Sequence, residues 1–225
     1  MKTSSNRRLI IMAHPDDPEL ACGGTVAQWV RSDDVYYIIV SCGEKGTWNK
    51  HDSPYCVAEQ REKEAQKAAQ FLGVKKVIFL HHPDGEVGGI KTLKIELAAL
   101  IRHIRPQTIV THDPWRRLFL PDLRASAWAV IDSIMIARDW HFYPFLREIG
   151  LKPHRAQQLL MTPTDNPTFI NDITKTFKKK ITAISIHRSQ LKQLPNWKKR
   201  ITEFAKKVGE RSGFEFAEGF YEMFV

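Results

Sequence analysis

Residues 9–24 read LIIMAHPDDPELACGG, and this stretch decides the fold. Its first five residues form a short apolar run that is typical of a buried strand. A loop of His, Pro and Asp follows, and Gly23-Gly24 then lies near the start of a helix predicted over residues 22–31. A buried strand that leads through a polar loop into a helix is the first unit of a parallel α/β sheet.

The rest of the chain repeats this alternation. The patterns predict strands at residues 36–41, 77–80, 108–111 and 159–162, and helices at residues 58–71, 92–104, 122–137, 172–187 and 195–208. Such alternation predicts an α/β fold with a Rossmann-like open, mostly parallel sheet and helices on both faces. We expect one domain over residues 1–225, in which about 140–225 form a C-terminal extension packed on the core.

The composition is that of an ordinary globular protein with a basic balance. The chain has 225 residues, is 43% hydrophobic and 26% charged, and carries a formal net charge of +9. The densest basic run, residues 175–180, lies in a helical pattern whose apolar positions are Ile173, Phe177, Ile181 and Ile184. We therefore expect these lysines on the solvated side of a helix, and the charge does not favour a nucleic-acid partner.

The cysteines and the hydropathy of the chain indicate the cellular compartment in which we expect the protein. The three cysteines are odd in number and show no CxxC spacing, which argues against disulfides and a structural zinc knuckle. No apolar run approaches the roughly 20 residues of a membrane-spanning helix, and residues 9–13 are too short for the core of a signal peptide. We expect a cytoplasmic protein with no membrane partner.

Three polar loops follow predicted strands, at residues 14–19, 82–86 and 112–117. In open parallel sheets, ligands bind beyond the carboxyl ends of the strands, so these loops are expected to converge on one site. This convergence carries more weight than any single motif.

The first loop has residue types that suit a metal site. His14 and Asp17 lie three residues apart on a turn fixed by Pro15, so both can reach one divalent ion. Asp16 between them is free to act as a general base, and Zn²⁺ accepts this mixed set of N and O ligands. The alternative is a helix-capping turn in which His14 makes an ordinary hydrogen bond.

The string AHPDDPEL at residues 13–20 resembles the signature of the PIG-L/LmbE-like N-acetylglucosaminyl deacetylases. The resemblance continues through most of residues 8–190. It includes Arg61, Glu64, residues 72–73, 83–86, 111–114 and 172–173, Lys180, Ala183 and residues 187–190.

The resemblance implies a Rossmann-like fold and zinc-dependent removal of an acetyl group from an N-acetylated sugar. It also implies that His14 and Asp17 are metal ligands, that Asp16 is the catalytic base and that Arg61 faces the substrate. Asp84 could bind sugar hydroxyls, although Pro-Asp-Gly is also a plain turn sequence.

His187 could stabilise an oxyanion as a second catalytic residue. It could equally cap or pack its helix, and the sequence leaves these alternatives open.

The sequence departs from the family at the third metal ligand. The family has a His-Pro-Asp-His motif there, whereas this chain reads Leu120-Pro121-Asp122-Leu123. Leucine can neither bind a metal nor donate to an oxyanion. Three replacements are conceivable: His112, Asp122, or a residue from another chain of a homo-oligomer.

Two functions remain open at this point. The first is a metal-dependent N-deacetylase, a hydrolase acting on the linear amide C–N bond of an N-acetylglucosamine-type sugar or sugar conjugate. The second, suggested by Leu123, is a catalytically impaired relative that serves as a sugar-binding or regulatory module. Either function implies a small N-acetylated sugar or glycoconjugate as the partner, and neither fixes the oligomeric state.

Overall fold

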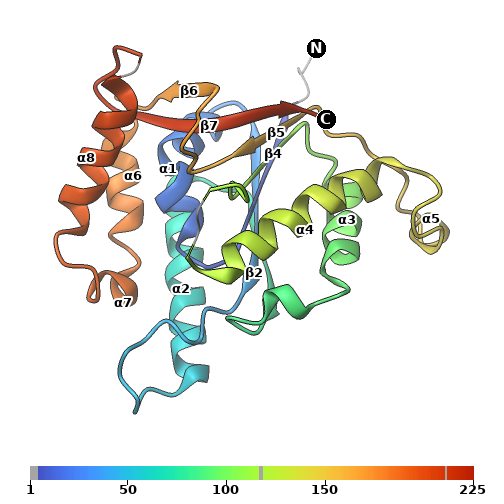
Figure 1. Cartoon of the computed structure of the whole chain (residues 1–225), viewed down its shortest axis with the longest axis horizontal. Coiled ribbons are helices and arrows are strands. Elements are labelled where there is room, and N and C mark those ends of the chain that lie inside the picture. Colours follow the sequence, from blue (N-terminus) through green and yellow to red (C-terminus); the bar gives the residue numbers. More distant parts are fainter. Residues whose placement is uncertain (1–4, 117–118, 211) are drawn as a thin grey trace.

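The computed structural model describes residues 5–116, 119–210 and 212–225. Seven strands form one sheet in the order β3-β2-β1-β4-β5-β7-β6 (Figure 1). They are β1 (Arg7–Met12), β2 (Asp34–Ser41), β3 (Lys76–His82), β4 (Thr108–Thr111), β5 (Gln158–Met161), β6 (Phe169–Asp172) and β7 (Ala217–Phe224).

Strands β1 to β5 run parallel to one another, and β7 runs antiparallel to both β5 and β6. The predicted mostly parallel, Rossmann-like sheet is therefore confirmed. Because five parallel strands share a direction, the loops that follow them meet at one edge of the sheet.

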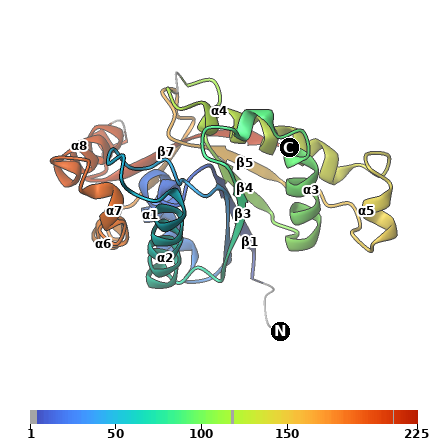
Figure 2. The same cartoon turned by 90° about the horizontal axis from the view of Figure 1, so that it is seen from below.

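Helices cover both faces of the sheet (Figure 2). One face carries α1 (Asp17–Trp29), α2 (Pro54–Leu72) and α6 (Phe177–Ile184), and the other carries α3 (Leu93–Ile104) and α4 (Pro121–Arg138). The smaller helices are η1 (Val87–Gly89), α5 (Phe145–Glu148) and α7 (Arg188–Leu191), and α8 (Trp197–Glu210) follows them.

Strand β1 shows why the sheet is buried on both faces. Leu9 and Ile11 belong to the core cluster beneath α3 and α4, whereas Ile10 and Met12 belong to the cluster beneath α1 and α2. Because side chains alternate along a strand, a continuous apolar run serves both cores.

Two predicted helices differ from the structure. The helix predicted over residues 22–31 begins at Asp17, because Pro18 suits the first turn of a helix. The helix predicted over residues 172–187 is wrong at its start: residues 169–172 form β6, and the helix spans only Phe177–Ile184. Asp172 there accepts a hydrogen bond from the Thr174 amide (2.9 Å), which makes a turn after the strand.

Helix α1 is broken at Cys22, whose φ of −139° and ψ of 23° are not helical. The break exposes backbone groups that one buried ion pair then satisfies. Glu218 on β7 accepts hydrogen bonds from the amides of Gly24 (2.9 Å) and Thr25 (2.7 Å). Lys180 on α6 lies 2.5 Å from Glu218 and donates to the Leu20 carbonyl (2.9 Å).

The burial of Lys180 corrects the prediction that the lysines of residues 175–180 are all solvated. Lys180 is only 4% exposed and Glu218 only 3%, whereas Lys178 and Lys179 are exposed as predicted. The hydropathy pattern could not distinguish Lys180 from its neighbours, because its partner lies 38 residues away in the sequence.

No helix among the described residues is long and apolar enough to cross a membrane. Strands from both sides of residue 140 share the sheet, which supports the one domain that we propose.

Removing either member of the buried ion pair should destabilise the fold. We expect Lys180→Met and Glu218→Gln each to lower the free energy of unfolding by about 3 kcal/mol, because each leaves one buried charge unpaired. Urea unfolding followed by circular dichroism measures this loss. Lys179→Met, an exposed lysine on the same helix, is the matched control and should change stability by less than about 0.5 kcal/mol. A double variant that loses the sum of the two single losses would contradict the pairing.

Candidate metal centre and active site

The site lies at the carboxyl ends of the parallel strands. The turn after β1 supplies His14, Asp16 and Asp17, the turn after β3 supplies Asp84, and the first turn of α4 supplies Asp122. The predicted convergence of the loops after β1 and β3 is therefore present, and the loop after β4 also reaches the site through His112.

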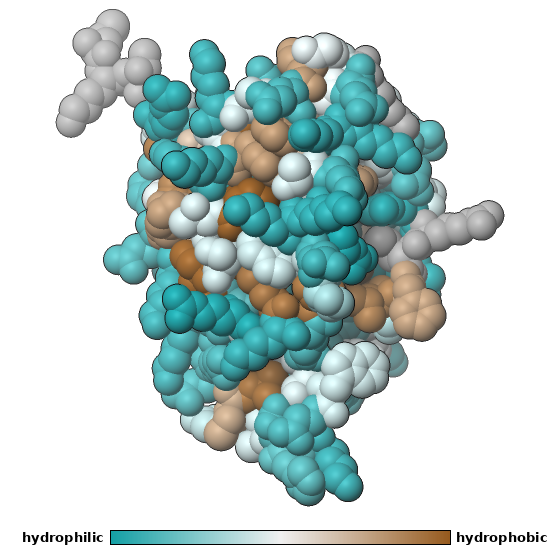
Figure 3. Space-filling model, turned by 90° about the vertical axis from the view of Figure 1, so that its left-hand side faces the viewer, coloured by the Kyte–Doolittle hydropathy of each residue, from teal (hydrophilic) through white to brown (hydrophobic). Residues whose placement is uncertain are grey.

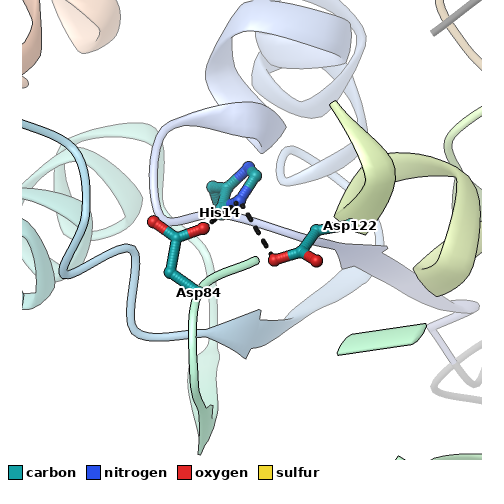
Figure 4. Close-up of side chains that lie close together, drawn as sticks. All are labelled: His14, Asp84 and Asp122. Carbon is teal, nitrogen blue, oxygen red and sulfur yellow. Dashed lines mark hydrogen bonds and ion pairs between the residues drawn. The ribbon is translucent and has the colours of Figure 1, made fainter. Parts of the chain in front are cut away.

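His14 is the central residue of this group (Figure 4). Its Nε2 atom lies 3.2 Å from Asp84 Oδ1 and 3.7 Å from Asp122 Oδ2. Its Nδ1 atom lies 3.4 Å from Asp17 Oδ2. The imidazole is thus placed between carboxylates on both sides, and it is only 8% exposed.

Asp122 also holds the neighbouring turn in place. Its carboxylate accepts hydrogen bonds from the Gly85 amide (2.6 Å) and the Val87 amide (3.3 Å), and the residue is 2% exposed. Pro121 precedes it at the start of α4, where an acidic side chain is favoured by the helix dipole. Asp122 therefore fixes the β3 loop against α4 and faces His14 at the same time.

The donor set fits a divalent metal. Among the described residues, His14, Asp84 and Asp122 each offer a ligand atom, and these atoms lie within 4.8 Å of one another. One imidazole nitrogen and two carboxylate oxygens form a ligand set that zinc and related ions accept.

The charge of the site supports the same reading. Asp16, Asp17, Asp84 and Asp122 bring four carboxylates, and the basic groups near them are Arg61, the Lys45 ammonium and the imidazoles of His14 and His112. A divalent cation would balance the excess of negative charge. An excess of this kind is costly in a partly buried site without a cation.

The carboxylates shift the proton affinity of His14. Burial lowers the pKa of His14, but its bonds with Asp122, Asp17 and Asp84 outweigh burial and hold the pKa well above its ordinary value. Burial raises the pKa of Asp17, but the nearby His112 and His14 outweigh it and hold the pKa far below its ordinary value. Asp17 is thus a carboxylate, as a metal ligand or a partner of His14 must be.

Asp17 and His112 lie on the Nδ1 side of His14. Asp17 Oδ2 accepts the His14 amide (2.7 Å) and lies 3.2 Å from His112 Nε2, which also accepts the Ala13 amide (3.2 Å). His112 Nε2 is therefore already engaged. Of the two replacements within this chain, Asp122 has the geometry of a third ligand and His112 supports the turn.

Asp16 points to Arg61 of α2. Arg61 Nη2 donates to Asp16 Oδ1 at 2.7 Å, and Nη1 donates to the Gly43 carbonyl at 2.7 Å. Gly43 has a φ of +67°, and a Cβ atom there would lie 2.4 Å from Arg61 Nη1. The glycine after β2 thus lets the loop close around the guanidinium.

His187 lies against Glu19 rather than facing open solvent. Its Nε2 atom is 3.0 Å from Glu19 Oε2, and both residues are at most 2% exposed. Burial lowers the pKa of His187, but the contact with Glu19 outweighs burial and raises it. The structure brings His187 to Glu19, two residues after Asp17, and its role at an oxyanion stays a prediction.

Sequence reasoning missed the contribution of the loop after β2. Glu44 accepts the Asp84 amide (2.9 Å), and the Lys45 amide donates to the Asp84 carboxylate (3.2 Å). The only available signal was position, because residues 43–45 follow a predicted strand as the other site loops do. The binding of substrate by Asp84 stays a prediction, and its place beside His14 makes it a candidate metal ligand as well.

Comparisons with known proteins agree with this site. Residues 9–131, more than half of the chain, match the family model PIG-L, described as GlcNAc-PI de-N-acetylase. The chain belongs to the PIG-L family.

Individual relatives point the same way. The chain is 30% identical over 215 residues to a diacetylchitobiose deacetylase of Thermococcus kodakarensis, covering 94% of this chain and 80% of that one. It is 25% identical over 190 residues to a probable N-acetyl-alpha-D-glucosaminyl L-malate deacetylase 2 of Bacillus cereus, covering 81% and 82%. The structure of N,N'-diacetylchitobiose deacetylase from Pyrococcus horikoshii superposes with a TM-score of 0.92 at 29% identity, covering 98% of this chain and 84% of that one.

These relatives are deacetylases, so the protein is an N-deacetylase-type hydrolase of amide bonds. The alternative of an impaired binding or regulatory module, which rested on Leu123, finds no support among them.

Substitutions around His14 should locate the metal. We expect His14→Gln, Asp84→Asn and Asp122→Asn each to weaken divalent-metal binding by at least about a hundredfold, because each removes a ligand from the Nε2 side. Asp17→Asn should weaken it less, by about 10–100-fold, if Asp17 only orients the ring. Isothermal titration with Zn²⁺ and Mn²⁺ measures these affinities.

Glu86→Gln is the matched control, because Glu86 lies in the same turn as Asp84 but its side chain is 66% exposed. If Asp17→Asn abolished binding while Asp84→Asn and Asp122→Asn did not, the ion would lie on the Nδ1 side, with Asp17 as the ligand.

Proposed function

We propose that this protein is a zinc-dependent N-deacetylase that hydrolyses the acetamide of an N-acetylglucosamine-type sugar or sugar conjugate. The observation that carries the proposal is the group of His14, Asp84 and Asp122 with the Asp16–Arg61 pair beside it. The substrate class follows from the relatives, whose names specify N-acetylated sugars.

We propose His14, Asp84 and Asp122 as the ligands of the metal. Asp17, a ligand by family resemblance, would accept a hydrogen bond from the other ring nitrogen of His14 and so fix the ring. A bound divalent ion supplies the Lewis acidity that polarises an amide carbonyl and lowers the pKa of water.

Asp16 is proposed as the general base. Arg61 occupies its Oδ1 atom, which orients the carboxylate and leaves Oδ2 for a proton. Asp16 would accept a proton from the water that attacks the acetyl carbonyl and return it to the departing amine. Because Arg61 is held by the Gly43 carbonyl as well, the position of Asp16 is fixed before the substrate arrives.

Two further roles belong to this proposal. His187, with its pKa raised by Glu19, would act as a charged donor to the oxygen that becomes negative. Arg61 would also face the substrate with the edge of its guanidinium.

The partner that we propose is a small sugar molecule rather than nucleic acid, and the location is the cytoplasm. A homo-oligomer is compatible with the proposal. Asp84 and Asp122 complete the ligand set within one chain, so the proposal needs no residue from a second copy.

The test is acetate release from N-acetylglucosamine and N,N'-diacetylchitobiose by the zinc-loaded protein. We expect Asp16→Asn to lower kcat by about 10²–10⁴-fold, because the proton acceptor is lost. Zinc binding by that variant should stay close to that of the parent protein.

Asp132→Asn, an exposed carboxylate on α4, is the control and should leave kcat unchanged. Full activity in Asp16→Asn would show that Asp16 is not the general base. Activity that persists after chelation and gel filtration, with no metal left, would overturn the metal-dependent reaction.

A further inference from the structure

A cleft of about 520 Å³ opens beside Asp17, at the turn that follows β1. Asp17, His112 and Leu123 line it on the side of the site, and residues of α7 and α8 line it on the opposite side. Its volume lies within the roughly 300–1,000 Å³ of sites that bind small molecules. The cleft meets the site at Asp17 and His112, on the Nδ1 side of His14, and His14, Asp84 and Asp122 are not among its lining residues.

The outer wall of the cleft is an apolar stripe. It is formed by Trp197, Ile201 and Phe204, which recur at the spacing of one face of α8, and by Leu194, which precedes that helix. Leu194 and Phe204 remain 36% and 48% exposed. Only Ala205 and Gly209 of α8 are buried, so the stripe contributes little to the core of the described chain.

The inner wall is apolar as well. Leu20 and Ala21 of α1 and Leu123 of α4 face the same cleft. Leu123 follows Asp122 directly on α4, and Leu123, not Asp122, lines the cleft. Where the family pattern has a polar imidazole, this chain presents a hydrocarbon surface.

The charged residues that line the cleft are mostly paired within the protein. Lys180 pairs with Glu218 at 2.5 Å, and Arg116 pairs with Asp165 at 3.3 Å. Figure 3 shows the face that carries α6 and α8, where hydrophobic residues gather in a band between hydrophilic ones. A mostly apolar cleft with a few polar groups at its rim is the usual form of a small-molecule site.

We propose that this cleft binds an alkyl or aryl group carried by the same substrate whose acetamide reaches His14. The preferred substrate is then an amphiphilic N-acylated sugar, rather than a free sugar. This inference rests on the proposed function. The apolar group could be the aglycone attached to the sugar, or it could be a longer acyl chain on the nitrogen.

Two pairs of substrates distinguish an apolar aglycone from a long acyl chain on the nitrogen. Methyl and n-octyl glycosides of N-acetylglucosamine differ only in the aglycone, and N-acetyl- and N-octanoylglucosamine differ only in the acyl chain. We expect kcat/KM of the zinc-loaded protein to be at least about tenfold higher for the longer member of one pair, because burying methylene groups stabilises the complex. The pair that shows the preference identifies the source.

Phe204→Ser tests whether the cleft causes the preference. We expect it to remove about tenfold of the preference for the longer substrate while kcat/KM for the shorter one stays the same. Phe142→Ser is the matched control, since Phe142 is 47% exposed and lies away from the cleft, and it should keep the preference.

The outcomes separate the two proposals. Absence of hydrolysis with every substrate would overturn the proposed function. Hydrolysis of the short substrates with no preference for the long ones would leave that function standing and overturn the role of the cleft. A preference for the long substrates that Phe204→Ser leaves unchanged would also overturn the role of the cleft. If the protein is a dimer and Phe204→Ser dissociates it, the cleft binds a second copy of the chain, and this outcome would overturn the role as well.

Discussion

The carboxylate of Glu218 holds together parts of the chain that are far apart in sequence. It caps the amides of Gly24 and Thr25 where α1 is broken, and Lys180 neutralises it from α6. Because α1 follows directly from the turn that carries His14, this contact ties the C-terminal strand to the metal site. At the break, the Glu218 carboxylate supplies the hydrogen-bond acceptors for the Gly24 and Thr25 amides.

A second constraint is the surplus of carboxylates around His14. Asp84 is held by the Lys45 amide and Asp122 by the amides of Gly85 and Val87, each from another loop. Asp17 accepts the His14 amide of its own turn, and Asp16 accepts a hydrogen bond from the Arg61 side chain. The fold therefore assembles the ligands before any ion arrives. In the ligand set that we propose, Asp122 supplies the ligand that Leu123 cannot, because the first turn of α4 places Asp122 beside His14.

Most of the fold followed from the sequence because its cause is local. Apolar runs such as residues 9–13 and 36–41 need no partner to be recognised, and Gly73 marks the end of the helical pattern that forms α2. Strand β6 was missed because its pairing with β7 joins residues about 50 positions apart, and no period marks it.

The site residues also divide into those that the local sequence indicated and those that only the folded structure brought together. His14, Asp16 and Asp17 lie on one short turn, and the string around them resembles a known signature. The meeting of His14 with Asp84 and Asp122 joins residues separated by about 70 and 108 positions, and the sequence suggested only that these loops converge. The choice between His112 and Asp122 needed the contact of His112 with the Ala13 amide, which is a property of the folded backbone.

The light packing of α8 has a consequence for local motion. A helix with few buried residues opens at a low free energy, whereas strands in the core open only with global unfolding. The amides of α8 should therefore exchange with solvent far sooner than those of β1 and β4. The wall of the cleft can then move aside to admit a bulky molecule, while the loops that hold His14 and Asp122 remain anchored to the most persistent part of the protein.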